Sequence, residues 1–398
     1  METEKKKVGL AIVTYGTNYG TYLQAFATQY AVRKAGYETE VINIDSVKTE
    51  VSNARKKYFL KQIFNLPEIK SYKNVLIGIV CEKTNKKYRE YISKRKSKFA
   101  EFREKNFDFS EIKNSWNGLA ELCRSYNYVL VGSDQLWRPA NIAGNFYTLN
   151  FVPDDITKIA YATSFGLGQI RENQKQITGD FLSRIEHLSV REESGAKIVN
   201  ELVNRNIPVV CDPTLLLTKE AWSDFLSDEP IVKEKYILSY LLGDNKQHRE
   251  FVKRLSEHTG CKVVAVKHIA GYIAMDKELG DIVPTDVGPF EFLNLIKNAE
   301  YVCTDSFHGC VFTTIFNRNL FAFRRFSKDS KMSTNSRITT LLSMLGMEDR
   351  LVYGNEDMSE YVAKHTDYSV VEERLEAKRK ESLSYLSDAF ANKNTDLN

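Results

Sequence analysis

The sequence contains no apolar run of the roughly 20 residues that a helix needs to cross a lipid bilayer. The chain opens with Met-Glu-Thr-Glu-Lys-Lys-Lys, and no apolar segment of signal-peptide length adjoins these residues. The six cysteines are scattered without zinc-ligand spacing, which is typical of free thiols in a reducing compartment. We therefore expect a cytoplasmic protein. Peripheral contact with the inner face of the membrane stays open as an alternative.

Patterns that are typical of cofactor and metal sites are missing as well. The chain begins with a strand, a turn, a helix and a strand, and Asp45 then stands where a dinucleotide-binding protein carries its ribose-binding acid. The glycine pattern G-x-G-x-x-G is absent, however, so we reject a nicotinamide cofactor. No H-E-x-x-H motif, cluster of histidines or Asp-x-Asp motif occurs, so we expect no catalytic metal and no bound cofactor.

Charge is distributed unevenly along the 398 residues. The net charge is only +4, yet residues 55–105 hold 16 Lys and Arg against 5 Asp and Glu. Residues 51–109 are predicted to form two or three helices inserted in the first domain, with aromatic side chains among the charges. We favour helices that pack on this domain and are solvated outside, over docking to an anionic membrane. We expect no nucleic acid as a partner, because no nucleic-acid-binding module accompanies the basic stretch.

The rest of the chain alternates short apolar strands with helices, which is typical of a doubly wound α/β fold. Its length predicts two domains, 1–217 and 218–398, and we assign a helix over residues 370–386 to the second. Several predicted strands end in polar residues, which is where open α/β sheets place ligands. These residues are Ser133, Asp134 and Gln135 after 128–131, Arg191 after 188–190, Asp212 after 209–211 and Asp305 after 300–304.

Residues 301–312 are the stretch around which the chain is organised. They read Tyr-Val-Cys-Thr-Asp-Ser-Phe-His-Gly-Cys-Val-Phe, a buried strand followed by polar residues and a helix from Val311. Gly309 is expected to mark a tight turn. Taken alone, His308 is more often a satisfied core histidine, and Asp305 a helix N-cap, than a catalytic pair.

The string Thr-Asp-Ser-Phe-His-Gly-x-Val-Phe at 304–312 resembles the signature of the polysaccharide pyruvyl transferase family. Further motifs follow in the family's order, and the resemblance covers about residues 8–346. Each motif alone is a weak signal, but six of them in order are specific. The others are N-Y-G-T-Y-L-Q-A at 18–25, V-G-S-D-Q-L-W at 131–137, Y-A-T-S-F-G at 161–166, V-R-E-E-S at 190–194 and D-P-T-L-L at 212–216.

The resemblance implies two Rossmann-like domains that face a cleft, as in the glycosyltransferase-B fold. It implies transfer of pyruvate from phosphoenolpyruvate, which is a substrate and not a cofactor, to a sugar of an oligosaccharide or polysaccharide, free or lipid-linked, with formation of a ketal. Such products belong to capsules and exopolysaccharides. Two other functions stay open: a nucleotide-sugar-dependent glycosyltransferase on the same architecture, and a non-catalytic module of a polysaccharide assembly complex.

The resemblance also implies roles for particular residues. His308 is similar to the family's acid, and Arg191 to an arginine that binds the donor anion. Ser306 stands where many members carry an arginine, so we add Arg325, Arg337 and the backbone near Ser306 and Gly309 as donor ligands. Asp305 and Asp134 are candidates for orienting the histidine or for accepting protons from hydroxyls. For the cleft and the acceptor we select Asn18, Gly20, Gln24, Ser133, Asp134, Gln135 and Asp212, and we predict that His308 lies near Arg191, Asn18 and Ser133.

Overall fold

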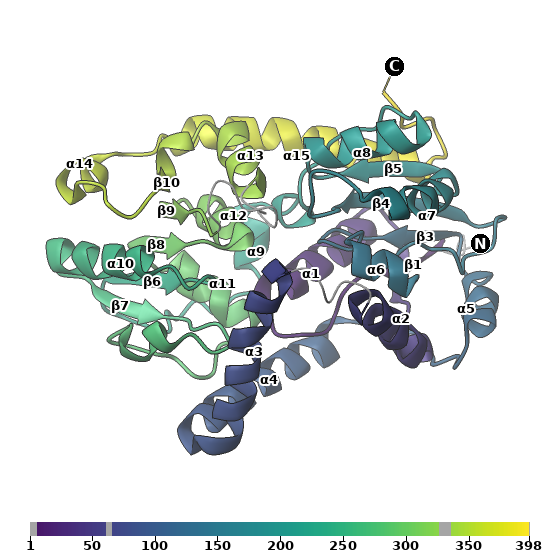
Figure 1. Cartoon of the computed structure of the whole chain (residues 1–398). Helices are drawn as coiled ribbons and strands as arrows, with labels where there is room; N and C mark the ends of the chain where they lie inside the picture. The colour runs from purple at the N-terminus through teal and green to yellow at the C-terminus, as the bar shows by residue number, and fades with distance from the viewer. Residues whose placement is uncertain (1–5, 61–65, 326–335, 398) are drawn as a thin grey trace.

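The computed structural model describes residues 6–60, 66–325 and 336–397. Two five-stranded sheets organise the chain, and the strands of both sheets pair in parallel (Figure 1). The first sheet has the order β2-β1-β3-β4-β5, with β1 Lys7–Ala11, β2 Glu38–Val41, β3 Tyr128–Val131, β4 Thr157–Thr163 and β5 His187–Val190. The second has the order β10-β9-β8-β6-β7, with β6 Tyr236–Tyr240, β7 Lys262–Ala265, β8 Tyr301–Thr304, β9 Asn319–Phe323 and β10 Leu351–Val352.

Helices join these strands and cover the sheets. The α-helices are α1 Tyr19–Lys34, α2 Lys48–Leu60, α3 Leu66–Thr84, α4 Lys86–Asn106, α5 Trp116–Cys123, α6 Pro139–Gly144, α7 Glu172–Ser183, α8 Glu193–Val203, α9 Lys219–Ser223, α10 Lys246–Thr259, α11 Pro289–Lys297, α12 Phe307–Ile315, α13 Ser336–Leu345, α14 Met358–Ala363 and α15 Tyr368–Phe390. The 3₁₀ helices are η1 Ile44–Val47, η2 Pro213–Leu215, η3 Ala274–Glu278 and η4 Glu348–Arg350.

Each sheet with its helices forms one Rossmann-like unit, which confirms the predicted fold class. Parallel strands are covered on both faces, and their sequences are therefore nearly continuous apolar runs. In β3 and β6 every residue is buried. The strand that we expected over 209–211 is reduced to a single bridge between Val190 and Val209. Within the described residues, none of the helices has the length and apolarity needed to cross a bilayer.

The two units are packed against each other where α1 meets α11 and α12. The ring of Tyr19, at the start of α1, stacks on Phe292 of α11 with centroids 4.3 Å apart, and its hydroxyl donates to the carbonyl of Val287 at 2.9 Å. Trp222 of α9 contacts Phe26 from the first unit and Phe312 from the second. One hydrophobic core therefore continues across the junction.

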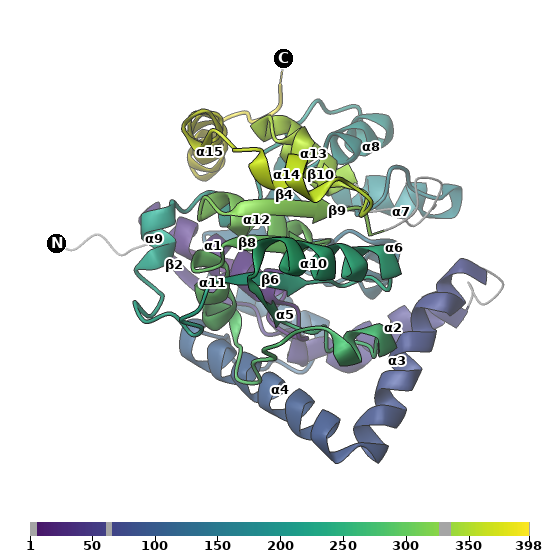
Figure 2. The ribbon, with the colours of Figure 1, turned by 90° about the vertical axis from the view of Figure 1, so that its left-hand side faces the viewer.

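The helical insert does not stay on the first unit. Although α2 packs on α6, helices α3 and α4 reach the second unit and form a V-shaped hairpin (Figures 1 and 2). The Tyr272 amide of the second unit donates to the carbonyl of Asn74 in α3 at 3.0 Å. Nζ of Lys98 in α4 lies 3.6 Å from Oε1 of Glu291 in α11. The packing that we expected on the first unit is also present, because Phe99 and Phe102 of α4 contact Tyr22 of α1, so the insert bridges both units.

The C-terminal helix α15 crosses from the second unit to the first (Figure 1). The Tyr385 hydroxyl donates to the Ala160 carbonyl at 3.0 Å, and the Ser382 hydroxyl accepts from the Cys211 amide at 2.9 Å. The Tyr128 hydroxyl donates to the carbonyl of Phe390. The helix also packs on α13 of the second unit, so the helix that we expected near the end of the chain joins both units.

Candidate active site

The histidine of the central motif lies in the first turn of α12. Ser306 is the N-cap residue, and its hydroxyl accepts the Gly309 amide at 3.3 Å. The helix therefore begins at Phe307, not at Val311, and Gly309 is a helical residue and not a turn. A Cβ atom at Gly309 would come within 2.5 Å of the Thr304 side chain, so glycine lets this turn approach β8. This packing buries His308 at the end of the strand.

The carboxylate of Asp305 is engaged by a loop of the second unit. Its carboxylate accepts the amides of Leu242 and Gly243 at 2.7 and 2.8 Å, in the loop that follows β6. Arg325 donates to the Asp305 carbonyl at 3.0 Å. Asp305 is therefore neither the N-cap of α12 nor the residue that orients His308, because its oxygens are engaged by a neighbouring strand end.

Asp212 is the carboxylate that reaches His308. Its Oδ2 lies 3.6 Å from Nε2 of His308, 2.7 Å from Nη1 of Arg191 and 3.0 Å from the Ser133 hydroxyl. Its Oδ1 accepts the Thr214 hydroxyl at 2.7 Å. Burial opposes the charged form, but His308 and Arg191 hold the pKa of Asp212 well below its usual range. The structure thus brings together His308, Arg191 and Ser133, as predicted.

Gly20 is the point where the first unit touches the histidine. A Cβ atom at this position would lie 2.0 Å from Nδ1 of His308, so only glycine fits the present arrangement. Asn18, two residues earlier, is the N-cap of α1 and accepts the Thr21 amide at 3.4 Å. The close approach makes the start of α1 one wall of the histidine site.

Asp134 forms a second wall. Its backbone has φ of +81°, a region that residues other than glycine seldom adopt and that often marks functional sites. Its Oδ2 accepts the Thr21 hydroxyl at 2.9 Å, and its Oδ1 lies 3.6 Å from Nη2 of Arg191. Burial raises the pKa of Asp134, but Arg191 and His308 outweigh this effect and hold the carboxylate in its charged form.

Two arginines converge on the ring of Phe307. The guanidinium carbon of Arg191 lies 5.1 Å from the ring centroid and that of Arg337, on α13, 5.7 Å from it. Burial and the charge of Arg191 lower the pKa of Arg337 to about 10. Burial also disfavours the charge on Arg191, but surrounding carboxylates, Glu192 first among them, raise its pKa above the usual value. An anionic ligand beside Arg337 would offset the unfavourable effect of burial and of Arg191 on its charge.

Several buried polar atoms of the selected residues have no hydrogen-bond partner among the residues that the structure describes. In native proteins such atoms are rare, and a cluster of them points to a ligand or to ordered water. They are Oε1 of Gln24, Nε2 of Gln135, Nη2 of Arg191, Nε2 of His308 and Nε of Arg337.

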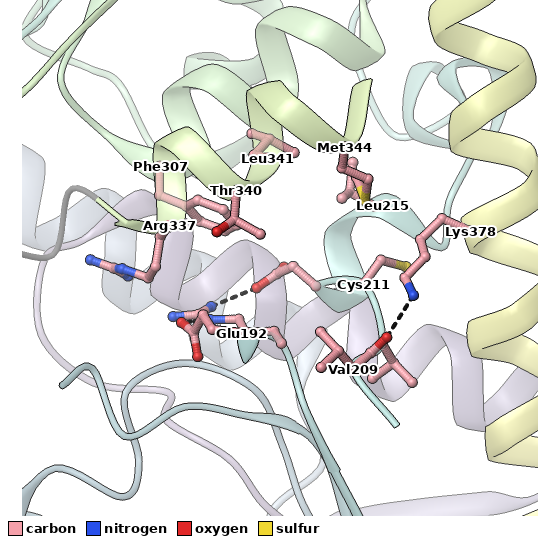
Figure 3. A pocket seen from close by; sticks show the side chains of 13 residues that line it. Glu192, Val209, Cys211, Leu215, Phe307, Arg337, Thr340, Leu341, Met344 and Lys378 are labelled. Carbon is pink, nitrogen blue, oxygen red and sulfur yellow. Dashed lines mark hydrogen bonds and ion pairs between the residues drawn. The ribbon is translucent and has the colours of Figure 1, made fainter. Parts of the chain in front are cut away.

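A cavity of about 50 Å³ opens beside the two arginines (Figure 3). Its lining includes the charged side chains of Arg191, Glu192 and Arg337 and the apolar side chains of Phe307, Leu341 and Met344. Within 6–60, 66–325 and 336–397, no group of three or more His, Cys, Asp or Glu side chains could hold a metal ion.

Three polar members of the site were not among the residues selected from the sequence. Thr21 bonds Asp134, the carboxylate of Glu192 accepts from Nε of Arg191 at 3.2 Å, and the Ser164 hydroxyl donates to Glu192 at 2.8 Å. All three lie inside the motifs quoted above, next to residues that we selected, and Glu192 directly follows Arg191. Their polar side chains and their position within these motifs could therefore have identified them as site residues.

The model of the family described as "Polysaccharide pyruvyl transferase" matches residues 18–325 of the chain. The chain belongs to this family. It is therefore a transferase of polysaccharide biosynthesis. A search of curated proteins finds no significant match.

Solved structures with a similar fold are distant in sequence. They include UDP-GlcNAc 2-epimerase from Methanocaldococcus jannaschii, with 13% identity, 94% of each chain covered and a TM-score of 0.46. The glycosyltransferase SnogD from Streptomyces nogalater has 12% identity, 98% coverage of each chain and a TM-score of 0.45. UDP-N-acetylglucosamine 2-epimerase from Rickettsia bellii has 10% identity, 97% and 99% coverage and a TM-score of 0.40. With such low scores, the fold class rests on the two parallel sheets themselves.

Proposed function

We propose that this family member transfers the carboxyethylidene group of phosphoenolpyruvate to two hydroxyls of a sugar in an oligosaccharide or polysaccharide. The observation that carries the proposal is the contact between His308 and the buried Asp212–Arg191 pair at the junction of the units. This contact joins a proton donor to a cation that suits an anionic substrate.

The donor carries a phosphate and a carboxylate, and the site offers two guanidinium groups for them. Many family members carry an arginine at the position of Ser306. Here Arg337 replaces the charge of that arginine, because it lies beside Phe307 together with Arg191. Charge-assisted hydrogen bonds from arginine are strong and geometrically specific for such anions. The amino end of α12 adds a favourable dipole at the same place.

The reaction needs an acid and an acceptor for hydroxyl protons. His308 gives a proton to the methylene carbon of the donor, and positive charge develops on the neighbouring carbon. One sugar hydroxyl adds to that carbon, phosphate leaves, and the second hydroxyl closes the ketal. Two hydroxyl protons are released: one leaves with the phosphate, and Asp134, whose side chain is 20% exposed, accepts the other, which replaces the proton given by His308. Asp212 is wholly buried and positions His308 and Arg191.

Phosphate release from phosphoenolpyruvate in the presence of a β-galactoside tests this proposal. We expect His308→Gln to lower the single-turnover rate by about 10²–10⁴-fold, because glutamine cannot act as an acid. Phosphoenolpyruvate affinity should stay within about tenfold, since the arginines hold the anion. Normal transfer by the variant would make His308 a scaffold residue.

A thermal-shift panel distinguishes the two other functions. Stabilisation of the wild-type protein by nucleotide-diphosphate sugars but not by phosphoenolpyruvate would indicate glycosyl transfer. Stabilisation by neither donor would favour a non-catalytic module.

A further inference from the structure

The apex of the α3–α4 hairpin carries a surface that the active site does not use. In both ribbon views this apex extends away from the two sheets (Figures 1 and 2). We call it the apex patch. It consists of the exposed residues Leu76, Ile79, Val80, Lys83, Lys86 and Lys87.

The apolar part of the apex patch faces away from the protein. Gly78 packs against the second unit, where a Cβ atom would lie 3.3 Å from the Tyr272 amide nitrogen. Successive residues of an α-helix are about 100° apart, so Leu76 and Val80 lie on the side opposite Gly78. Their exposed fractions are 62% and 59%, and Ile79 beside them is 46% exposed. The contact that anchors the hairpin thus leaves these side chains in solvent.

The charge of this segment identifies the kind of surface it fits. Residues 55–105 hold 16 Lys and Arg against 5 Asp and Glu, whereas the whole chain has a net charge of only +4. The excess of positive charge is therefore concentrated in the insert. Part of it lies in the apex patch, next to the exposed apolar side chains, on Lys83, Lys86 and Lys87. Apolar side chains with lysines at their edge are typical of helices that lie in the interface of an anionic bilayer.

We propose that the apex patch docks on an anionic phospholipid membrane and thereby brings a membrane-borne, lipid-linked sugar acceptor to the active site. A second copy of the chain is the poorer occupant, because a symmetric dimer through this patch would place like charges together. The identity of the acceptor rests on the proposed function, but docking to the membrane does not.

Vesicle co-sedimentation of the full chain tests the proposal. We expect binding to vesicles of equal parts phosphatidylcholine and phosphatidylglycerol, and little binding to phosphatidylcholine alone. Binding should weaken as salt rises, because the Debye length falls from about 10 Å at 0.1 M to about 3 Å at 1 M. Lys83→Glu with Lys87→Glu, and separately Leu76→Ser with Val80→Ser, should each weaken binding at least about tenfold.

Matched controls are Lys197→Glu with Lys253→Glu, exposed on α8 and α10, and Ile177→Ser, exposed on α7. These variants should bind the vesicles as the wild type does. Equal binding by the hairpin variants, or no binding by the wild type, would overturn the proposal. So would a dimer of the wild type that the Leu76→Ser, Val80→Ser variant abolishes. Binding without any pyruvyl transfer would instead refute the proposed function and leave the docking surface in place.

Discussion

In the proposed function, Arg337 compensates for the serine in the central motif. Replacing it by alanine removes one of two guanidiniums beside Phe307, and we expect phosphoenolpyruvate to bind about tenfold to a hundredfold more weakly. Calorimetric titration measures this change. Arg324→Ala is a suitable control, because Arg324 donates to the Tyr353 hydroxyl at 2.9 Å and lies outside the cluster. Equal effects of the two substitutions would remove Arg337 from the donor site.

Gly20 sets the position of the imidazole. In Gly20→Ala the new methyl group would overlap the ring of His308, so one of the two must move. A displacement of about 1 Å typically costs about a hundredfold in rate, and we expect such a loss in single-turnover transfer. Gly168→Ala is the control, since a Cβ there meets nothing within 4 Å. A Gly20→Ala enzyme with the wild-type rate would contradict the proposed role of this contact.

For individual residues, the sequence correctly predicted that Arg191, Ser133 and His308 lie together. It did not predict which carboxylate contacts the histidine. Arg191 and Ser133 follow β5 and β3, Asp212 follows the segment that bridges to β5, and parallel strands bring their carboxyl ends to one edge. Asp305 is closer to His308 in sequence, but its oxygens take the amides of Leu242 and Gly243. The contact between Asp212 and His308 depends on how the two units pack, and a local pattern does not encode that packing.

Among the elements, α10 contains a buried histidine that makes stability depend on pH. His248 stacks on Phe323 of β9 at 4.4 Å, and burial lowers its pKa from 6.5 to about 4. Between pH 6.5 and about 4, His248 takes up a proton in the unfolded chain but stays neutral in the folded protein. The free energy of unfolding therefore has its full value, as far as this histidine is concerned, above pH 6.5, and it falls as the pH is lowered to about 4. The loss from this histidine is about 3 kcal/mol.

Urea unfolding of His248→Gln at pH 7 and at pH 4 measures this contribution. We expect a smaller fall in unfolding free energy than in the wild type. Some dependence should persist, because burial also lowers the pKa of His268 to about 4. His258→Gln, at the exposed end of the same helix, should behave as the wild type. If the fall in unfolding free energy between pH 7 and pH 4 were the same in His248→Gln as in the wild type, other groups would govern acid unfolding.

The ends of helices and strands were predicted correctly where several local sequence signals pointed to the same boundary. Helix α11 begins at Pro289 and ends at Lys297 as predicted, and β3 occupies 128–131 as predicted. The start of α12 was predicted too late, because Ser306 caps the helix and Gly309 is tolerated inside it for its close contact with Thr304. Such a contact between a helix and its own strand overrides the usual turn preference of glycine.

For the whole molecule we expect chelation to leave catalysis intact. In the proposed function the two arginines beside Phe307 supply positive charge for the donor, and the described residues include no cluster of three possible metal ligands. Phosphate release measured before and after treatment with EDTA checks this expectation. Loss of turnover that one divalent ion restores would show a metal-dependent step.

The path of α15 has a consequence for the order in which the protein is made. Residues 368–390 leave the ribosome after the second unit's strands, yet Ser382 and Tyr385 cover the first sheet through bonds to Cys211 and Ala160. The second unit has by then emerged with all its strands. Domains usually fold in the order of synthesis. Here the amino-terminal unit is complete only after the strands of the second unit have been synthesised.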